Sequence, residues 1–217
     1  MNAGPNVIAK ATPFHYIEGQ LLVALTSSVG VGSPTWSLPE TPVYYQHTSL
    51  QSLEQMLRTQ CGLTPRNVRY REQLYAFELP AADSSSRSDI CLTYLYVSPE
   101  LLWHKGTKHI GLFPVERLPQ LSTSDHQIIT YALERLRSKA LYTTLPAFLL
   151  PKEFSLSAYQ QVFETLTGRT VDKRNFRKKL LALDVLSPVT TGRAIKRGDT
   201  QLYQLQHQDL IVLPKPF

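Results

Sequence analysis

Two hydrophobic periods follow one another along this chain. Up to about residue 120, several stretches rich in Val, Leu, Tyr and Phe alternate partly with period two, which predicts β-strands. These stretches are residues 7–11, 20–26, 68–78 and 90–97. Between the second and third, Leu50, Leu53 and Leu57 recur at helical spacing, and Gly62 follows where a helix tends to end. This part is therefore predicted to be an α+β domain with one helix, at about 49–60.

From residue 124 onward the apolar residues recur every three or four positions, which predicts helices. The first of these helices is expected to run to about residue 140, with Ser124 and Asp125 as capping candidates. The segment 141–151 contains two prolines and is the predicted boundary. We therefore expect one domain at 1–143 and a second at 144–217.

The second domain shows the order of a winged helix-turn-helix. Two short helices are predicted at 155–166 and 173–183, with Ser157 and Asp172 as their capping residues. After Pro188, two strand-like pieces surround a polar hairpin at 190–200. Helix, turn, helix and hairpin in this order predict a DNA-binding module.

Positive charge is concentrated in the same segment. The chain carries a net charge of +6, and residues 147–217 hold 11 of its 23 basic residues but only 6 of its 17 acidic ones. Such a local excess is typical of nucleic-acid-binding domains, although membrane surfaces and acidic proteins attract basic patches too. The charge pattern therefore favours double-stranded DNA as a partner without excluding other acidic surfaces.

The second short helix divides into an apolar arc with Phe176 and Leu180 and a neighbouring basic arc. The first turn of a recognition helix meets base edges, and later basic residues and those of a wing meet phosphates. The alternative is that this basic run is only a solvated helix face. The predicted DNA-binding residues are Lys173, Arg174, Asn175, Arg177, Lys178, Arg193, Lys196 and Arg197.

Other classes of protein are disfavoured by what the sequence lacks. No apolar run approaches the roughly 20 residues of a membrane span, and the first residues do not resemble a secretory signal, so we expect a cytoplasmic protein without membrane contact. Two cysteines, Cys61 and Cys91, are too few for a disulfide framework and lack zinc-ligand spacing. We expect both to be packing residues, and no bound metal or cofactor.

Several segments together resemble one family, the NrtR-like Nudix-related transcriptional regulators. They are WSLP at 36–39, CGL at 61–63, EQLYAFEL at 72–79, DHQIITYALERLR at 125–137, LLPKEFSL at 149–156 and DKRNFRKKL at 172–180. The resemblance implies a Nudix-type α/β/α sandwich followed by a winged helix. It also implies a homodimeric repressor on a pseudo-palindromic operator, with a nucleotide-sugar effector such as ADP-ribose, in NAD, cofactor or related sugar metabolism.

The resemblance also assigns a degenerate Nudix box. The box, G-x5-E-x7-R-E-U-x-E-E-x-G-U with U a bulky aliphatic residue, aligns without a gap when it ends at 62–63. Hydrolysis at such a site needs carboxylates that hold Mg²⁺. All acidic box positions are lost, so we predict no catalytic residue and no enzymatic activity. The altered positions are Thr41, His47, Gln55, Met56, Thr59 and Gln60.

The effector contacts can only be suggested from side-chain chemistry. Tyr75 and Phe77 could stack on a base, and Arg87 could meet a phosphate. Two other functions remain open at this point. One is an active Nudix hydrolase of ADP-ribose-like diphosphates, and the other is an interaction scaffold that does not bind DNA.

Overall fold

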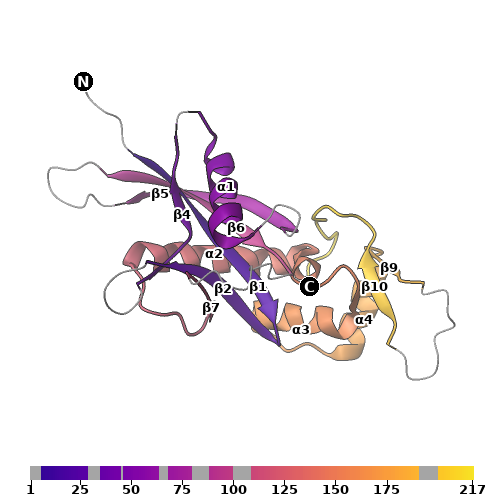
Figure 1. Cartoon of the computed structure of the whole chain (residues 1–217). Helices are drawn as coiled ribbons and strands as arrows, with labels where there is room; N and C mark the ends of the chain where they lie inside the picture. Colours follow the sequence, from indigo (N-terminus) through magenta and orange to yellow (C-terminus); the bar gives the residue numbers. More distant parts are fainter. Residues whose placement is uncertain are drawn as a thin grey trace. The chain divides into compact units, whose positions relative to one another are not determined.

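The computed structural model describes residues 6–28, 35–44, 46–63, 68–79, 88–99, 109–190 and 200–217 (Figure 1). The chain forms two compact units, of which the first comprises residues 1–15 and 22–132 and the second residues 16–21 and 133–217. This division falls inside helix α2 (Thr123–Tyr142). The predicted domain boundary between residues 143 and 144 stays a prediction.

A mixed β-sheet forms the centre of the first unit. Its main path runs β3-β2-β1-β6-β5, with β4 paired to β1 and β7 to β2, and β1 and β6 are parallel. All four predicted strands are present, whereas β3, β4 and β7 were too short to leave a hydrophobic pattern. The strands are β1 (Val7–Ile17), β2 (Gln20–Ser27), β3 (Trp36–Ser37), β4 (Glu40–Pro42), β5 (Tyr70–Leu79), β6 (Asp89–Val97) and β7 (Ile110–Pro114).

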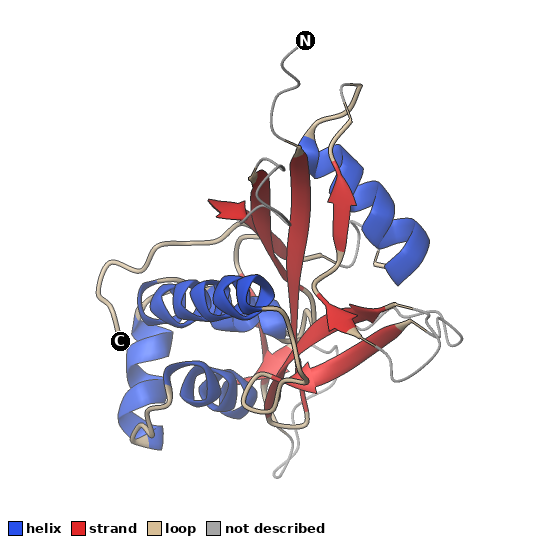
Figure 2. Cartoon of the chain, turned by 90° about the vertical axis from the view of Figure 1, so that its left-hand side faces the viewer, coloured by secondary structure: helices blue, strands red, loops and turns tan. Residues whose placement is uncertain are grey.

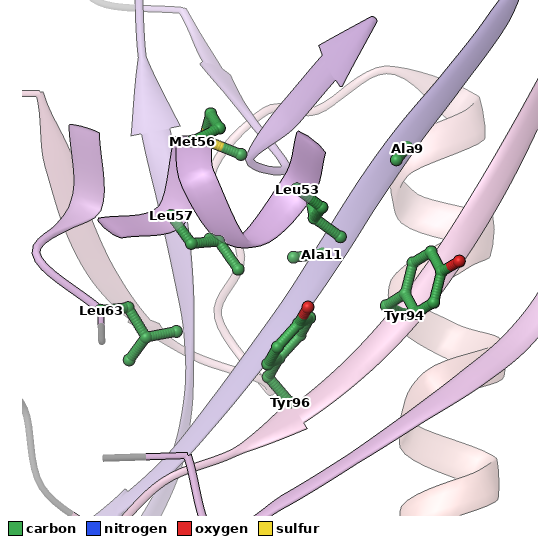
Figure 3. Close-up of a cluster of buried hydrophobic side chains, with 8 residues drawn as sticks. All are labelled: Ala9, Ala11, Leu53, Met56, Leu57, Leu63, Tyr94 and Tyr96. Carbon is green, nitrogen blue, oxygen red and sulfur yellow. The ribbon is translucent and has the colours of Figure 1, made fainter. Parts of the chain in front are cut away.

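Helix α1 (Ser49–Cys61) covers one face of this sheet. Its Leu53 and Leu57 are buried in one cluster with Ala11 of β1 and Tyr96 of β6, and the close-up in Figure 3 shows these side chains between helix and strands. Thr48 and Gln51 form a capping box at the start of the helix. Gly62 ends it with φ of 65°, which confirms the predicted role of this glycine.

The first turns of α2 lie on the opposite face. Lys10 follows Ala9 on β1 and therefore points the other way, where its Nζ is 2.7 Å from Oδ1 of Asp125. Asp125 also accepts a hydrogen bond from the Leu38 amide at 3.1 Å. The cap of α2 is Ser122, whose Oγ accepts from the Asp125 amide, so the predicted caps Ser124 and Asp125 were wrong. The sheet thus lies between two helical layers, and Figure 2 shows α1 along one side of the strands.

The second unit contains the predicted winged helix. A 3-10 helix, η1 (Leu145–Leu149), precedes α3 (Leu156–Thr167) and α4 (Lys173–Ala182). A small antiparallel sheet has the order β8-β10-β9, formed by β8 (Phe154–Ser155), β9 (Leu186–Pro188) and β10 (Leu202–Leu205). The first strand-like piece was predicted to begin after Pro188. Strand β9 instead ends at Pro188, and its Leu186 pairs with Leu205 of β10.

Aromatic side chains hold the two helices of this unit together. The ring of Phe176 on α4 lies 5.0 Å from that of Phe163 on α3 and 4.8 Å from that of Phe217. Asp172 caps α4 as predicted, since its side chain accepts from the Asn175 amide at 2.8 Å. Helix α3 is capped by Ser155, not by the predicted Ser157.

Two expectations about composition can be compared with this structure. Cys91 is a free, buried thiol, as expected of a packing residue, and burial raises its pKa to about 12. The side chain of Cys61 lies outside the described residues. Within the described part of the chain, we find no helix with the length and apolarity that crossing a membrane requires.

Candidate DNA-binding helix and effector domain

Helix α4 separates a packed face from an exposed polar face. Phe176 and Leu180 are buried at 5% and 0% exposure. Five residues of this helix are predicted to contact DNA. Four of them are exposed, namely Lys173, Arg174, Asn175 and Lys178. The packed face holds the helix in place while three cations and one amide are presented to solvent.

Arg177 is placed differently from the other predicted DNA contacts. It is only partly exposed, and its Nη2 donates to Oγ of Ser157 at the start of α3. Its Nε is buried without a hydrogen-bond acceptor in the described part of the chain. Arg177 therefore lies between the two helices, where it can fix the orientation of α4.

The turn between α3 and α4 is held by specific hydrogen bonds. Oε1 of Glu164 accepts from the Val171 amide at 2.9 Å and from Gln160 Nε2 at 3.1 Å. Gly168 ends α3 with φ of 66°, a conformation that glycine adopts without strain. A defined turn of this kind fixes the angle between the helices of a helix-turn-helix. The predicted wing residues Arg193, Lys196 and Arg197 lie outside the described residues.

In the first unit, the six altered box positions gather around one cavity of about 310 Å³. They come from β4, the segment that follows it, and α1. Sequence reasoning missed two further lining residues, Tyr44 and Ser52. Ser52 lies three and four positions before Gln55 and Met56, a helical spacing that could have indicated it. The cavity is lined by Thr41, Tyr44, His47, Ser52, Gln55, Met56, Thr59 and Gln60.

No carboxylate belongs to the described lining of this cavity. Glu54, one position from the box register, instead forms an ion pair with Arg71 on β5. Across the described ranges, no group of three or more His, Cys, Asp or Glu side chains is placed to hold a metal ion. The cavity keeps the position of the Nudix box but presents hydroxyls, amides, an imidazole and a thioether.

The predicted effector contacts Tyr75 and Phe77 lie in another group. Their rings are 5.5 Å apart, and each is about 6 Å from Tyr131 of α2, which sequence reasoning missed. Phe77 also lines a cavity of about 400 Å³ with Ile90. Because α1 packs on the other face of the sheet, this aromatic group and the box cavity are separate. Arg87 is outside the described residues.

Two comparisons match parts of this chain to known regulators. Residues 146–205 match the NrtR DNA-binding winged helix domain. Over 89 residues the chain is 29% identical to the ADPR responsive transcriptional repressor NtrR of Acinetobacter baylyi, which covers 41% of this chain and 36% of that protein. The match therefore spans about a third of the length of this relative.

The fold is similar to that of Shewanella oneidensis NrtR over nearly the whole chain. Its crystal structure gives a TM-score of 0.78 at 25% identity and covers 98% of both chains. A complex of that protein with a 27mer DNA gives 0.75 at 24% identity, over 92% of this chain and 93% of the other. The Nudix domain of that protein, in complex with ADP ribose, gives a TM-score of 0.50 at 22% identity, over 62% of this chain and 90% of the other.

These similarities agree with the site geometry in both parts of the chain. The first part has the Nudix fold with a box cavity whose described lining lacks carboxylates, and the second has two helices and a small sheet. The chain is thus similar to NrtR in both parts: a Nudix fold with a degenerate box is followed by residues 146–205, which match the NrtR DNA-binding winged helix domain.

Proposed function

We propose that this protein is a DNA-binding transcriptional repressor whose Nudix-type domain senses a nucleotide sugar such as ADP-ribose. The observation that carries the proposal is the exposed face of α4, where Lys173, Arg174, Asn175 and Lys178 stand opposite a buried aromatic anchor. The names of the relatives support it, because one is an ADPR responsive repressor and another was crystallised with DNA.

Each residue of α4 has a role in this proposal. Lys173, Arg174 and Asn175 form the first turn and reach base edges in the major groove, where Arg or Lys can bind guanine and Asn can bind adenine. Lys178 and the wing residues Arg193, Lys196 and Arg197 bind phosphates. Arg177 supports this face from its position between α3 and α4.

We further propose a homodimer on a pseudo-palindromic operator, in the cytoplasm, that controls NAD, cofactor or related sugar metabolism. One small winged helix reads few base pairs, so two half-sites give more specific affinity than one. A hydrolase is disfavoured because the described lining of the box cavity has no carboxylate to hold Mg²⁺. A pure scaffold would leave the exposed cationic face of α4 without a role.

Selection of bound fragments from genomic DNA, followed by fluorescence anisotropy on the selected operator, tests DNA recognition. Arg174→Ala should lower operator affinity by about 1–3 kcal/mol and relax sequence preference. Arg137→Ala, an exposed arginine on α2, is the matched control and should leave affinity unchanged. If Arg174→Ala combined with Arg177→Ala keeps wild-type affinity, α4 is not the recognition helix.

The predicted contacts Tyr75, Phe77 and Arg87 are one proposed position for the effector. Tyr75 is 58% exposed, so its ring is available to stack on a base. Calorimetry of Tyr75→Ala with ADP-ribose tests this position. A large loss of affinity would support stacking on the aromatic group, whereas unchanged affinity would exclude it.

A further inference from the structure

Helix α4 has few buried side chains to hold it in place. Of its ten residues, only Phe176 and Leu180 are buried. A cavity of about 230 Å³ lies beside Phe176 and extends to Asn175 and Lys179 of the same helix, so α3 alone does not fill the space next to Phe176. A recognition helix must present its base-contacting side chains at a fixed angle, because a loosely held site loses specific affinity. Another part of the chain is therefore needed to support α4.

The segment of residues 211–217 supplies this support through Phe217. The ring of Phe217 is stacked on that of Phe176, with centroids 4.8 Å apart and an interplanar angle of 29°. It also lies 5.0 Å from the ring of Phe163 on α3 and lines the cavity beside Phe176. Phe217 therefore packs against both helices, and loss of its ring would enlarge the cavity and uncover one side of Phe176.

Lys179 holds α4 to the same segment. Its Nζ donates a hydrogen bond to the Pro216 carbonyl at 2.6 Å and lies 5.2 Å from the centre of the Phe217 ring, within the range of a cation–π contact. A lysine on a recognition helix is ordinarily expected to bind phosphate, but this ammonium group already contacts a carbonyl and an aromatic face. The neighbouring Lys178 is exposed and is the proposed phosphate contact.

The 211–217 segment is itself fixed to the last turn of α2. The Leu213 amide donates to the Tyr142 carbonyl at 2.7 Å. The Phe217 amide donates to the Leu141 carbonyl at 2.8 Å. These are backbone hydrogen bonds, so they hold the segment in place independently of its side chains. The segment is therefore a fixed support for α4.

We propose that Phe217 and Lys179 are positioning residues for DNA recognition, which hold α4 against the 211–217 segment so that its first turn meets base edges at one angle. Neither side chain contacts DNA; both act through the orientation of α4. This inference rests on the proposed function, because it takes α4 as the recognition helix.

Fluorescence anisotropy with the full chain tests the inference on two duplexes, the selected operator and a scrambled duplex of the same composition. Phe217→Ala and Lys179→Met should each lower operator affinity by about 3- to 10-fold, the range for ordering one side chain on binding. Their affinity for the scrambled duplex should be unchanged, because non-specific binding depends on phosphate contacts. Phe217→Tyr keeps the ring and should retain operator affinity. Val212→Ala, at a 68% exposed position in the same segment, is the matched control and should match the wild type.

The dependence of operator affinity on salt separates a positioning role from a direct contact. Lys178→Met should reduce the slope of this dependence by about one, as the loss of one phosphate contact does. Lys179→Met should lower the affinity and leave the slope as in the wild type, because its ammonium group contacts Pro216 and Phe217 instead of DNA.

Three results would overturn the inference. They are unchanged operator affinity in Phe217→Ala, a reduced salt slope in Lys179→Met, and an equal loss on both duplexes, which would mean that only the folded fraction has fallen. Arg174→Ala is measured in parallel as the test of α4 itself. If Arg174→Ala loses operator affinity while Phe217→Ala keeps it, recognition by α4 stands and only the positioning role is rejected. If both variants keep wild-type affinity, both proposals are rejected.

Discussion

Residues of α1 that pack and residues that face the cavity follow different rules. Leu53 and Leu57 keep the apolar character that anchors the helix on the sheet. Gln55, Thr59 and Gln60 face the cavity and contribute little to packing, since all three are exposed. The acidic side chains that hydrolysis needs can therefore be lost from the cavity-facing positions, while the apolar positions still hold the helix on the sheet.

The absence of box acids predicts an absence of hydrolysis. We expect no turnover of ADP-ribose, NADH or nucleoside triphosphates with Mg²⁺ or Mn²⁺, because Met56, Thr59 and Gln60 cannot hold the cation. Product formation is measured by chromatography against a buffer control. Turnover above that control that EDTA abolishes would show a working site and contradict the assignment. Glutamates restored at the three positions need not restore activity, since His47 and Gln55 also depart from the box.

The pair formed by Lys10 and Asp125 is a second residue-level feature. Burial by itself lowers the pKa of Lys10, but hydrogen bonds and charges from Asp125 and then Glu40 outweigh it, so the pKa lies above its ordinary value. Lys10→Met should destabilise the protein by about 3–5 kcal/mol, because Asp125 is left charged, buried and without its partner. Urea unfolding measures this cost. Glu40 is the half-exposed partner of Lys10, so Glu40→Gln should destabilise the protein by less than about 1 kcal/mol. Similar losses of stability in the two variants would contradict this account.

His15 predicts a dependence of stability on pH. Burial lowers the pKa of His15 to about 4. The hydrogen bond to the Ser98 carbonyl raises this pKa but does not outweigh burial. Between the ordinary value of about 6.5 and about 4, the unfolded chain binds a proton that the folded chain does not. Stability should therefore fall as pH decreases through this window, by up to about 3 kcal/mol. Urea midpoints at pH 7.5 and 4.5 measure this, and His15→Gln should show a smaller difference. An unchanged difference in His15→Gln would assign the effect to other groups.

At the scale of elements, the stability of α4 depends on the residue that caps its N-terminus. Asp172 accepts from the Asn175 amide, and no carboxylate stands in the first turn of the helix to replace it. Asp172→Ala should lower the free energy of unfolding by about 0.5–2 kcal/mol, the usual value of an N-cap. Thermal unfolding provides the measurement, and Asp209→Ala at an exposed loop position is the control. An unchanged melting temperature for Asp172→Ala would show that α3 packing alone holds the helix.

At the scale of the whole molecule, the proposed function couples effector and operator. An effector that releases DNA must bind the free protein more tightly than the DNA-bound protein, and the coupling is reciprocal. We expect ADP-ribose to weaken operator binding by about 5- to 150-fold, and operator DNA to weaken ADP-ribose binding by the same factor. Anisotropy and calorimetry measure the two factors. Arg174→Ala should bind ADP-ribose as the wild type does. If millimolar ADP-ribose changes neither affinity nor melting temperature, the first domain is not its sensor.

Local sequence patterns were sufficient for the elements whose formation depends on local forces. The strand patterns of β1, β2, β5 and β6, the glycine end of α1 and the Asp172 cap of α4 all follow from neighbouring residues. The division of α4 into a buried and an exposed face also follows from its helical period. The missing box acids were visible directly, because residue identity does not depend on folding.

Only the tertiary structure decided which distant residues meet. Ser52 joined the altered box positions because β4 and α1 line one cavity, and Tyr131 joined Tyr75 because α2 crosses that face of the sheet. Arg177 belongs to the basic arc by period, yet its contact with Ser157 depends on how α3 packs on α4. The Lys10–Asp125 pair joins residues 115 positions apart. Spacing along the chain carries no record of such pairs, because packing between elements creates them.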